Sequence, residues 1–199
     1  MANATTPFGL IGRKNLSSQP YNSGVRQYSV AAGNATAIFV GDLVTLAGTS
    51  QIINGQIFSD VVQSATGDIF TGVVVGVLPV TRDTANYRAA STQAILFVED
   101  DPNTEFEIRQ SAGGTPLTAN DIGLNANIVV GAGNTFSGWS GMALDNSTEA
   151  TTNTLDCKIV GMVNRADNDP GTAVGTGEPG STFIVRLNRH RFANQIAGI

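Results

Sequence analysis

The chain contains a single cysteine and a single histidine among its 199 residues. One cysteine, Cys157, excludes an internal disulfide framework and any zinc site built from several cysteines. It alternates with apolar neighbours, which predicts a buried structural thiol. One histidine, His190, leaves little for nucleophilic triads and proton shuttles, and no G-x-S-x-G, P-loop or H-E-x-x-H pattern occurs. We therefore expect no enzymatic activity, no cofactor and no metal site.

Charged residues are also scarce, at 14% of the chain, whereas hydrophobic residues make up 41%. A chain of this length and composition can build its own core, and disordered chains carry more charge. The longest apolar stretch, 69–80, is interrupted by glycine and proline and is too short to span a bilayer. The first residues lack the basic region and apolar run of a signal peptide. We expect a protein made in the cytoplasm with no membrane partner.

The few charges are segregated along the chain. Residues 1–41 hold three basic residues and no acidic one, and residues 183–199 hold three arginines and no acidic residue. All 16 acidic residues lie between positions 42 and 182. An acidic body argues against a broad nucleic-acid interface. The basic ends suit contact with an acidic partner surface, although cations that lie near the ends by chance are the open alternative.

Short β-branched or aromatic segments, bounded by Gly, Asn, Asp or Pro, dominate from residue 27 onward and predict strands. They are 27–32, 36–48, 69–80, 92–99, 104–110, 125–133, 136–144, 154–164 and 181–190. No apolar helical stripe exceeds two turns, and the nearest is a short turn over 121–124 capped by Thr118 or Asn120. The pattern predicts an all-β protein, with a single β-barrel or β-sandwich-like domain over 27–199 and short helical turns.

Residues 1–26 differ from this body because their hydrophobicity is not periodic. Pro7 and Pro20 prevent a long helix or a central strand. We expect an extended N-terminal arm over 1–26. Its apolar side chains, including Phe8 and Leu10, would attach it to its own body or to a neighbouring subunit.

The densest group of charges is "EDDPNTEFEIRQ", residues 99–110, which places five carboxylates in nine positions. A calcium loop would need a glycine at its sixth position and a glutamate at its twelfth, and the stretch has neither. Glu105 and Glu107 would lie about 7 Å apart on one strand face, near the spacing of inverting glycosidases. That spacing is common to any two acids at i and i+2 on a strand.

The alternation of apolar and charged residues along a strand explains the same stretch more simply. Phe106 and Ile108 would point to one face of a strand, whereas Glu105, Glu107 and Arg109 would point to the other, as in a half-buried strand. The "DDPN" before it is typical of a turn. We expect a polar contact of the Glu105, Glu107 and Arg109 face with a neighbouring subunit, and no chemistry on a substrate.

Eight phrases, taken in order, resemble a family of tailed-bacteriophage head decoration, or capsid cement, proteins. They are "MANATTPFGL" at 1–10, "FVGDLV" at 39–44, "TGVVVGV" at 71–77, "FVEDDPNTEFEIRQ" at 97–110, "DIGLNANIV" at 121–129, "SGMALD" at 140–145, "KIVGMVNRADND" at 158–169 and "FIVRLNRHRF" at 183–192. The resemblance covers nearly the whole chain.

The resemblance implies a structural protein of the virion. Such proteins are β-rich, dock as trimers, less often dimers, on the outer surface of the phage head, and stabilise it by bridging major capsid protein subunits. Their N-terminal arms commonly contact the capsid. The side chains expected to contact the capsid or a neighbouring subunit are Phe8, Leu10, Arg13, Lys14, Arg26, Glu105, Glu107, Arg109, Arg189 and Arg191.

A phage tail or fibre-associated protein that binds a host surface or a glycan is the alternative. Its site would combine Trp139 with the Gly- and Pro-rich loop at 167–181. A hydrolase that uses the carboxylates of residues 99–107 is a third hypothesis, which the alternation of the stretch disfavours.

Overall fold

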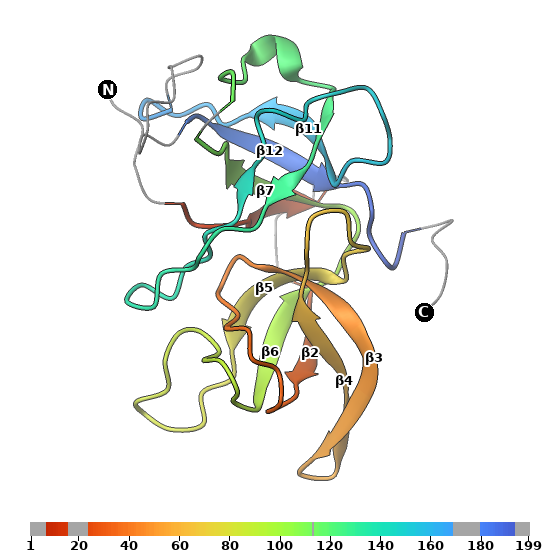
Figure 1. The fold of residues 1–199 in the computed structure, drawn as a ribbon, viewed down its shortest axis with the longest axis vertical. Coiled ribbons are helices and arrows are strands. Elements are labelled where there is room, and N and C mark those ends of the chain that lie inside the picture. The colour runs from red at the N-terminus through yellow and green to blue at the C-terminus, as the bar shows by residue number, and fades with distance from the viewer. Residues whose placement is uncertain (1–6, 16–23, 113, 169–179, 194–199) are drawn as a thin grey trace.

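In the computed structural model, which describes residues 7–15, 24–112, 114–168 and 180–193, the chain is almost entirely β structure (Figure 1). The strands are β1 (Ile11–Asn15), β2 (Val25–Val30), β3 (Leu43–Ile53), β4 (Gln56–Gln63), β5 (Gly72–Val77), β6 (Ala94–Glu99), β7 (Thr104–Arg109), β8 (Asn125–Ala126), β9 (Ile128–Val129), β10 (Ala143–Leu144), β11 (Cys157–Met162) and β12 (Thr182–Leu187). One 3-10 turn, η1 (Ala119–Asp121), carries the predicted Thr118 cap. The predicted all-β class is confirmed.

Five strands close into a barrel in the order β2-β4-β3-β5-β6. Strand β6 has the continuous apolar sequence of a central strand and pairs antiparallel with β2 on one side and β5 on the other. β2 and β4 run parallel and meet at Ser29 and Asp60. The interior is filled by Tyr28, Val30, Ile38, Val44, Val61, Val74, Leu96 and Val98.

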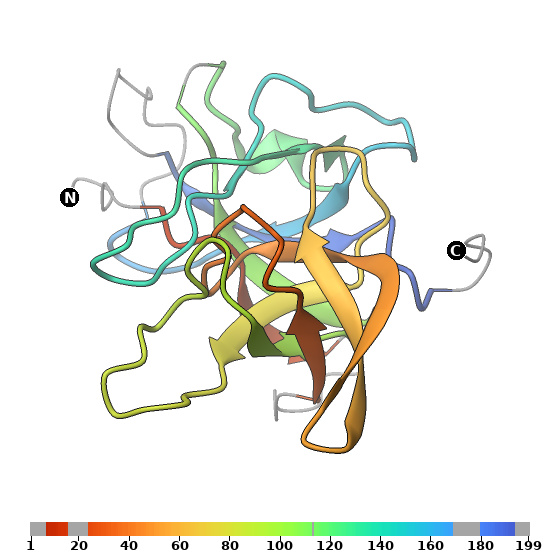
Figure 2. The same cartoon turned by 60° about the horizontal axis from the view of Figure 1, so that its bottom comes forward.

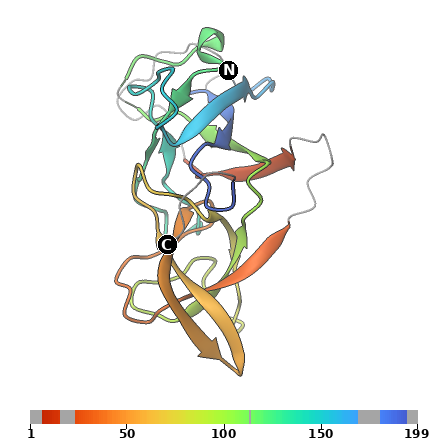
Figure 3. The same cartoon turned by 90° about the vertical axis from the view of Figure 1, so that its right-hand side faces the viewer.

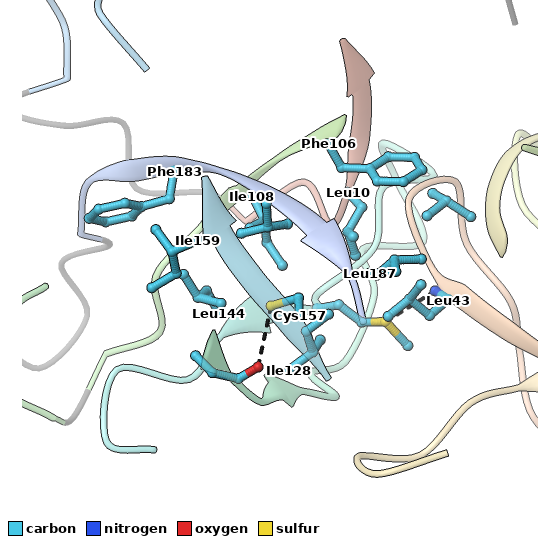
Figure 4. Packing of buried hydrophobic residues seen from close by; sticks show 14 of the residues in the cluster. Leu10, Leu43, Phe106, Ile108, Ile128, Leu144, Cys157, Ile159, Phe183 and Leu187 are labelled. Carbon is cyan, nitrogen blue, oxygen red and sulfur yellow. Dashed lines mark hydrogen bonds between the residues drawn. The ribbon is translucent and has the colours of Figure 1, made fainter. Parts of the chain in front are cut away.

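The second half of the fold is an antiparallel sheet in the order β1-β7-β12-β11-β8, with the short β9–β10 pair beside it. It lies above the barrel in Figure 1, and the turned views of Figures 2 and 3 show the sheet and the barrel from two other sides. The larger core lies against this sheet and includes Phe106, Ile108 and Phe183 (Figure 4). Leu43 and Val73 of the barrel strands belong to the same core, so one packed cluster joins the two halves.

Cys157 lies within this larger core, as the sequence predicts. Its side chain is fully buried, and its Sγ donates to the carbonyl of Ala126 at 3.3 Å (Figure 4). Burial raises the pKa of the thiol well above its usual range, with the charge of Asp156 as a second cause. A thiol in this position stays protonated and unreactive.

The hairpin β3–β4 shows what the sequence prediction missed. Residues 56–63 were not expected to form a strand, yet β4 pairs with β3 along most of its length. Asn54 and Gly55 have φ values of 52° and 80°, and both are positive, as a type I′ hairpin turn requires. The Asn-Gly dipeptide was the available signal, and the Ser, Asp and Gln content of the strand concealed it.

The N-terminal segment also differs from the prediction. The described part of the expected arm is extended, but β1 is an edge strand of the sheet, paired with β7. Leu10 is 2% exposed within the larger core. Gly9 permits this approach, because a Cβ at its position would lie 2.4 Å from the carbonyl oxygen of Gly41. Strand β2 begins at Val25, inside the range assigned to the arm.

Arg88 is the largest fully buried side chain among the described residues, at 1% exposure. Its guanidinium donates to four backbone carbonyls, those of Ala31, Asn34, Thr36 and Thr92. Its own backbone forms a two-way bridge with Ile38. The side chain therefore holds the connection between β2 and β3 against the end of the barrel.

We predict that Arg88→Met lowers the free energy of unfolding by about 3 kcal/mol, because it removes all four of these hydrogen bonds, made by a side chain that is itself fully buried. Urea unfolding followed by fluorescence measures the change. Arg82→Met, at an exposed position of the same loop, is the matched control and should change stability by less than about 0.5 kcal/mol. Equal effects of the two substitutions would contradict the role assigned to Arg88.

Candidate functional site

Strand β7 carries the acidic stretch, and its two faces have different surroundings. Phe106 and Ile108 point into the larger core (Figure 4), as the alternation predicts. Glu105 and Glu107 lie on the other face, where Glu105 is buried and Glu107 is half-buried. Neighbouring side chains therefore cover the outer face of the strand more completely than the sequence suggested.

Basic side chains pair with both of these glutamates. Arg13 Nη1 lies 2.7 Å from Glu107 Oε1, and Arg165 Nη1 lies 3.2 Å from Glu107 Oε2. Lys14 Nζ lies 3.4 Å from Glu105 Oε2. Because β1 is the neighbour of β7 in the sheet, the basic residues of the expected arm are brought directly onto the acidic stretch.

Arg26 of the barrel strand β2 also forms an ion pair with an acidic residue of the 99–110 stretch. Its Nε lies 3.3 Å from Asp100 Oδ2, and the Tyr28 hydroxyl donates to the same oxygen at 2.8 Å. Burial raises the pKa of Asp100, although Tyr28 and Arg26 oppose that shift. All three basic residues of positions 1–41 thus have acidic partners within their own chain. The prediction that they contact an acidic partner surface remains untested, but these internal pairs account for them.

The "DDPN" segment is a turn held by side-chain hydrogen bonds, as predicted. Asp101 Oδ1 accepts from the amide of Asn103 at 2.9 Å, and Oδ2 accepts from the Asn15 side chain at 2.6 Å. Arg186 Nε donates to the carbonyl of Pro102 at 3.2 Å. Within the described residues, no group of three or more His, Cys, Asp or Glu side chains could hold a metal ion.

The remaining predicted contact residues occupy varied positions. Arg109 lies over the ring of Phe8, with its Cζ 4.8 Å from the ring centroid, a cation–π contact within the chain. Leu10 lies in the core and is therefore not a surface contact. Arg189 is half-buried and donates to the carbonyl of Thr154 at 3.3 Å, and Arg191 is also half-buried.

Sequence reasoning missed a set of large apolar side chains exposed at turns. Phe136 is 99% exposed, at the tip of the turn between Asn134 and Gly138. The Asn134 side-chain oxygen accepts from the amides of Phe136 and Ser137 at 2.9 and 3.1 Å, and the Gly138 amide donates to the Asn134 carbonyl at 2.8 Å. These bonds hold the turn that presents the ring to solvent. The Asn and Gly residues that flank it were the available signal.

Trp139 follows this turn and lines two neighbouring uncharged hollows. The first, about 400 Å³, is named here the apolar groove, and its lining includes Ile11, Val25, Val75, Phe97 and Trp139. The second, about 370 Å³, has Trp139 beside the polar side chains of Thr84, Asn86 and Ser137. Trp139 itself is 38% exposed. Of the alternative site, Trp139 thus lies in a hollow, whereas most of the 167–181 loop falls outside the described residues.

His190 is buried beside Phe70 and Phe192 and takes part in the fold. Its Nδ1 accepts from the Phe192 amide at 3.2 Å, and its ring lies 5.9 Å from that of Phe192. Burial lowers the pKa of His190 to about 4, which the charge of Asp101 partly opposes. The imidazole is therefore neutral at pH 7, and its environment is that of a structural side chain.

Comparison with family models, with curated proteins and with solved structures found no match. Among the described residues, no helix is both long enough and apolar enough to cross a membrane.

We predict that the chain loses stability as the pH falls from about 6.5 to about 4, because the unfolded His190 binds a proton in that window and the folded one does not. The loss attributable to this residue is about 3 kcal/mol. Denaturant unfolding of the wild type and His190→Gln across this window isolates it, since both proteins share every other titrating group. The two stabilities should converge as the pH falls, and parallel pH profiles would contradict the assignment.

We also predict a weak, salt-sensitive coupling between Arg13 and Glu107. A double-mutant cycle with Arg13→Gln and Glu107→Gln should give about 0.5 kcal/mol at low salt, since the pair is partly exposed, and less at high salt. A cycle between Lys158→Gln, at an exposed position of β11, and Glu107→Gln is the control and should give zero. No coupling between Arg13 and Glu107 at low salt would contradict the pairing.

Proposed function

We propose that this chain is a structural virion protein that decorates the outer surface of a tailed-phage head. It binds major capsid protein subunits, bridges neighbouring ones and thereby stabilises the shell. It acts as a homo-oligomer, with a trimer favoured over a dimer. This proposal joins the ordered sequence resemblance to the arrangement of side chains in the fold.

The observation that carries the proposal is the exposure of Phe136 on a hydrogen-bonded turn. Phe136 is 99% exposed, and aromatic side chains are enriched at the centres of protein interfaces. Because hydrogen bonds fix the backbone of the turn that carries this ring, its binding to a partner pocket costs little backbone entropy. Phe136 is therefore the proposed anchor on the capsid.

The five-stranded sheet, with its ion pairs on β7, is the stable part of the fold that carries this anchor. The two glutamates on the outer face of β7 form ion pairs within the chain, so the stability of the sheet does not depend on charges of a capsid partner. A cement protein resists internal pressure through contacts summed over many copies, so each contact can be modest. An aromatic anchor repeated over the shell satisfies that requirement.

Glycan binding at Trp139 is a second candidate function. The observation that favours it is the second hollow, where the indole lies beside Thr84, Asn86 and Ser137. An aromatic face with neighbouring amide and hydroxyl groups suits a sugar ring. This candidate corresponds to a tail or fibre-associated protein that binds the host surface.

Binding to undecorated heads tests the proposal. Purified chain is added to heads of the phage that encodes it, assembled without this chain, and occupancy and head melting are measured. We predict saturable binding and a higher melting temperature for the heads. Phe136→Ser should weaken binding about tenfold or more, because a buried Phe side chain contributes about 1.5–3 kcal/mol.

Ile122→Ser is the matched control, since Ile122 is an exposed apolar residue at the end of η1 and not part of the Phe136 turn. It should bind as the wild type does. Absence of binding to heads would contradict the proposal. Glycan binding that Trp139→Ala abolishes would then favour the second candidate.

A further inference from the structure

We propose that the tip of the β3–β4 hairpin of one copy binds in the apolar groove beside Trp139 of a neighbouring copy. The contact is head-to-tail, and its repetition assembles copies of this chain into a closed oligomer. This inference deepens the oligomeric part of the proposed function. It identifies the two surfaces that would meet.

The hairpin tip has the composition of an interface core. Ile52 and Ile57 are directly opposed across the two strands, and they are 74% and 75% exposed. Residues 47–59 contain no charged side chain. Exposed hairpin ends are usually protected by charges that prevent pairing with other chains, and this one is not. Depletion of charge around large apolar residues is typical of the centre of a protein interface.

The base of the hairpin is held in place. Asp60 of β4 accepts hydrogen bonds from the hydroxyls of Ser29 and Thr49 at 2.6 and 2.7 Å, and from the Gln51 side chain. Gln51 in turn accepts from the Gln93 side chain at 2.6 Å. These bonds attach the projecting ribbon to the barrel, so the two isoleucines are presented in a fixed position. Preorganisation of this kind lowers the entropic cost of binding.

The apolar groove matches the tip in chemistry and size. Its lining side chains carry no charge, and Ile11, Val25 and Trp139 are each more than a third exposed. Its volume of about 400 Å³ is that of a cleft able to take a small ligand. An uncharged, apolar segment is the occupant that such a lining selects. Among the described residues, the hairpin tip combines those properties with a projecting shape.

The two surfaces lie too far apart to meet within one copy. The hairpin projects from the end of the barrel away from the five-stranded sheet, as Figures 1 and 3 show. The groove lies where β1 of that sheet meets β2 and β5 of the barrel. A projection and a complementary groove at separate places form a heterologous contact, which generates a closed ring when the rotation between copies closes.

Sedimentation equilibrium of the purified chain, without any capsid, tests the proposal. We predict that the wild type has the mass of a closed oligomer. The double variant Ile52→Asp with Ile57→Asp should be a folded monomer, because it places two charges in an apolar groove. Ile122→Asp, which adds a charge to an exposed apolar position at the end of η1 that belongs to neither surface, should keep the wild-type mass.

Cysteine cross-linking tests whether the hairpin tip binds in the apolar groove of a neighbouring copy. Gln56→Cys lies beside the isoleucine pair, Val25→Cys lies in the groove, and the native Cys157 is buried. A short bis-maleimide should give a covalent dimer when the two variants are mixed and none when either is treated alone. Ile52→Asp with Ile57→Asp, added to the Gln56→Cys chain, should abolish that product.

A monomeric wild type, or an oligomer whose mass the aspartate pair leaves unchanged, would overturn the inference. So would the absence of the mixed cross-link. Binding to undecorated heads is measured separately, so failure here leaves that test of the proposed function intact.

Discussion

The antiparallel pairing of β7 with β1 on one edge and β12 on the other is the interaction on which the rest of the fold depends. It joins segments from near both ends of the chain to a strand from the middle. The inward side chains of β7 close the larger core, and its outward glutamates receive the basic residues of β1. Because that core also contains barrel residues such as Leu43, the same pairing fixes the sheet to the barrel.

The parts of the fold that follow from local sequence were predictable. Alternation of apolar and charged residues gave the two faces of β7, and Thr118 was one of the two caps predicted for the short turn. The edge position of β1 was not, because its pairing with β7 joins residues about 90 positions apart and no local pattern encodes that register. Leu10 was predicted to attach the arm to its own body or to a neighbouring subunit, and the fold places it in the core of its own chain.

The candidate interaction surfaces were harder to predict from the sequence than the strands were. Charged residues suggested a binding surface in the sequence, but many of them form ion pairs within the chain. Phe136 and the Ile52–Ile57 pair occur in segments whose composition is that of ordinary turns, and only the fold shows that they are exposed among the residues that the structure describes. An exposed apolar side chain held on a hydrogen-bonded turn is a sharper indication of a binding surface than net charge is.

The central claim is that this chain belongs to the outside of a phage head. Cryo-electron microscopy of the virion that contains it tests this claim most directly. We predict density that fits the barrel and the five-stranded sheet on the outer surface of the head, in contact with neighbouring capsid subunits. The same density found only on the tail or its fibres would contradict it.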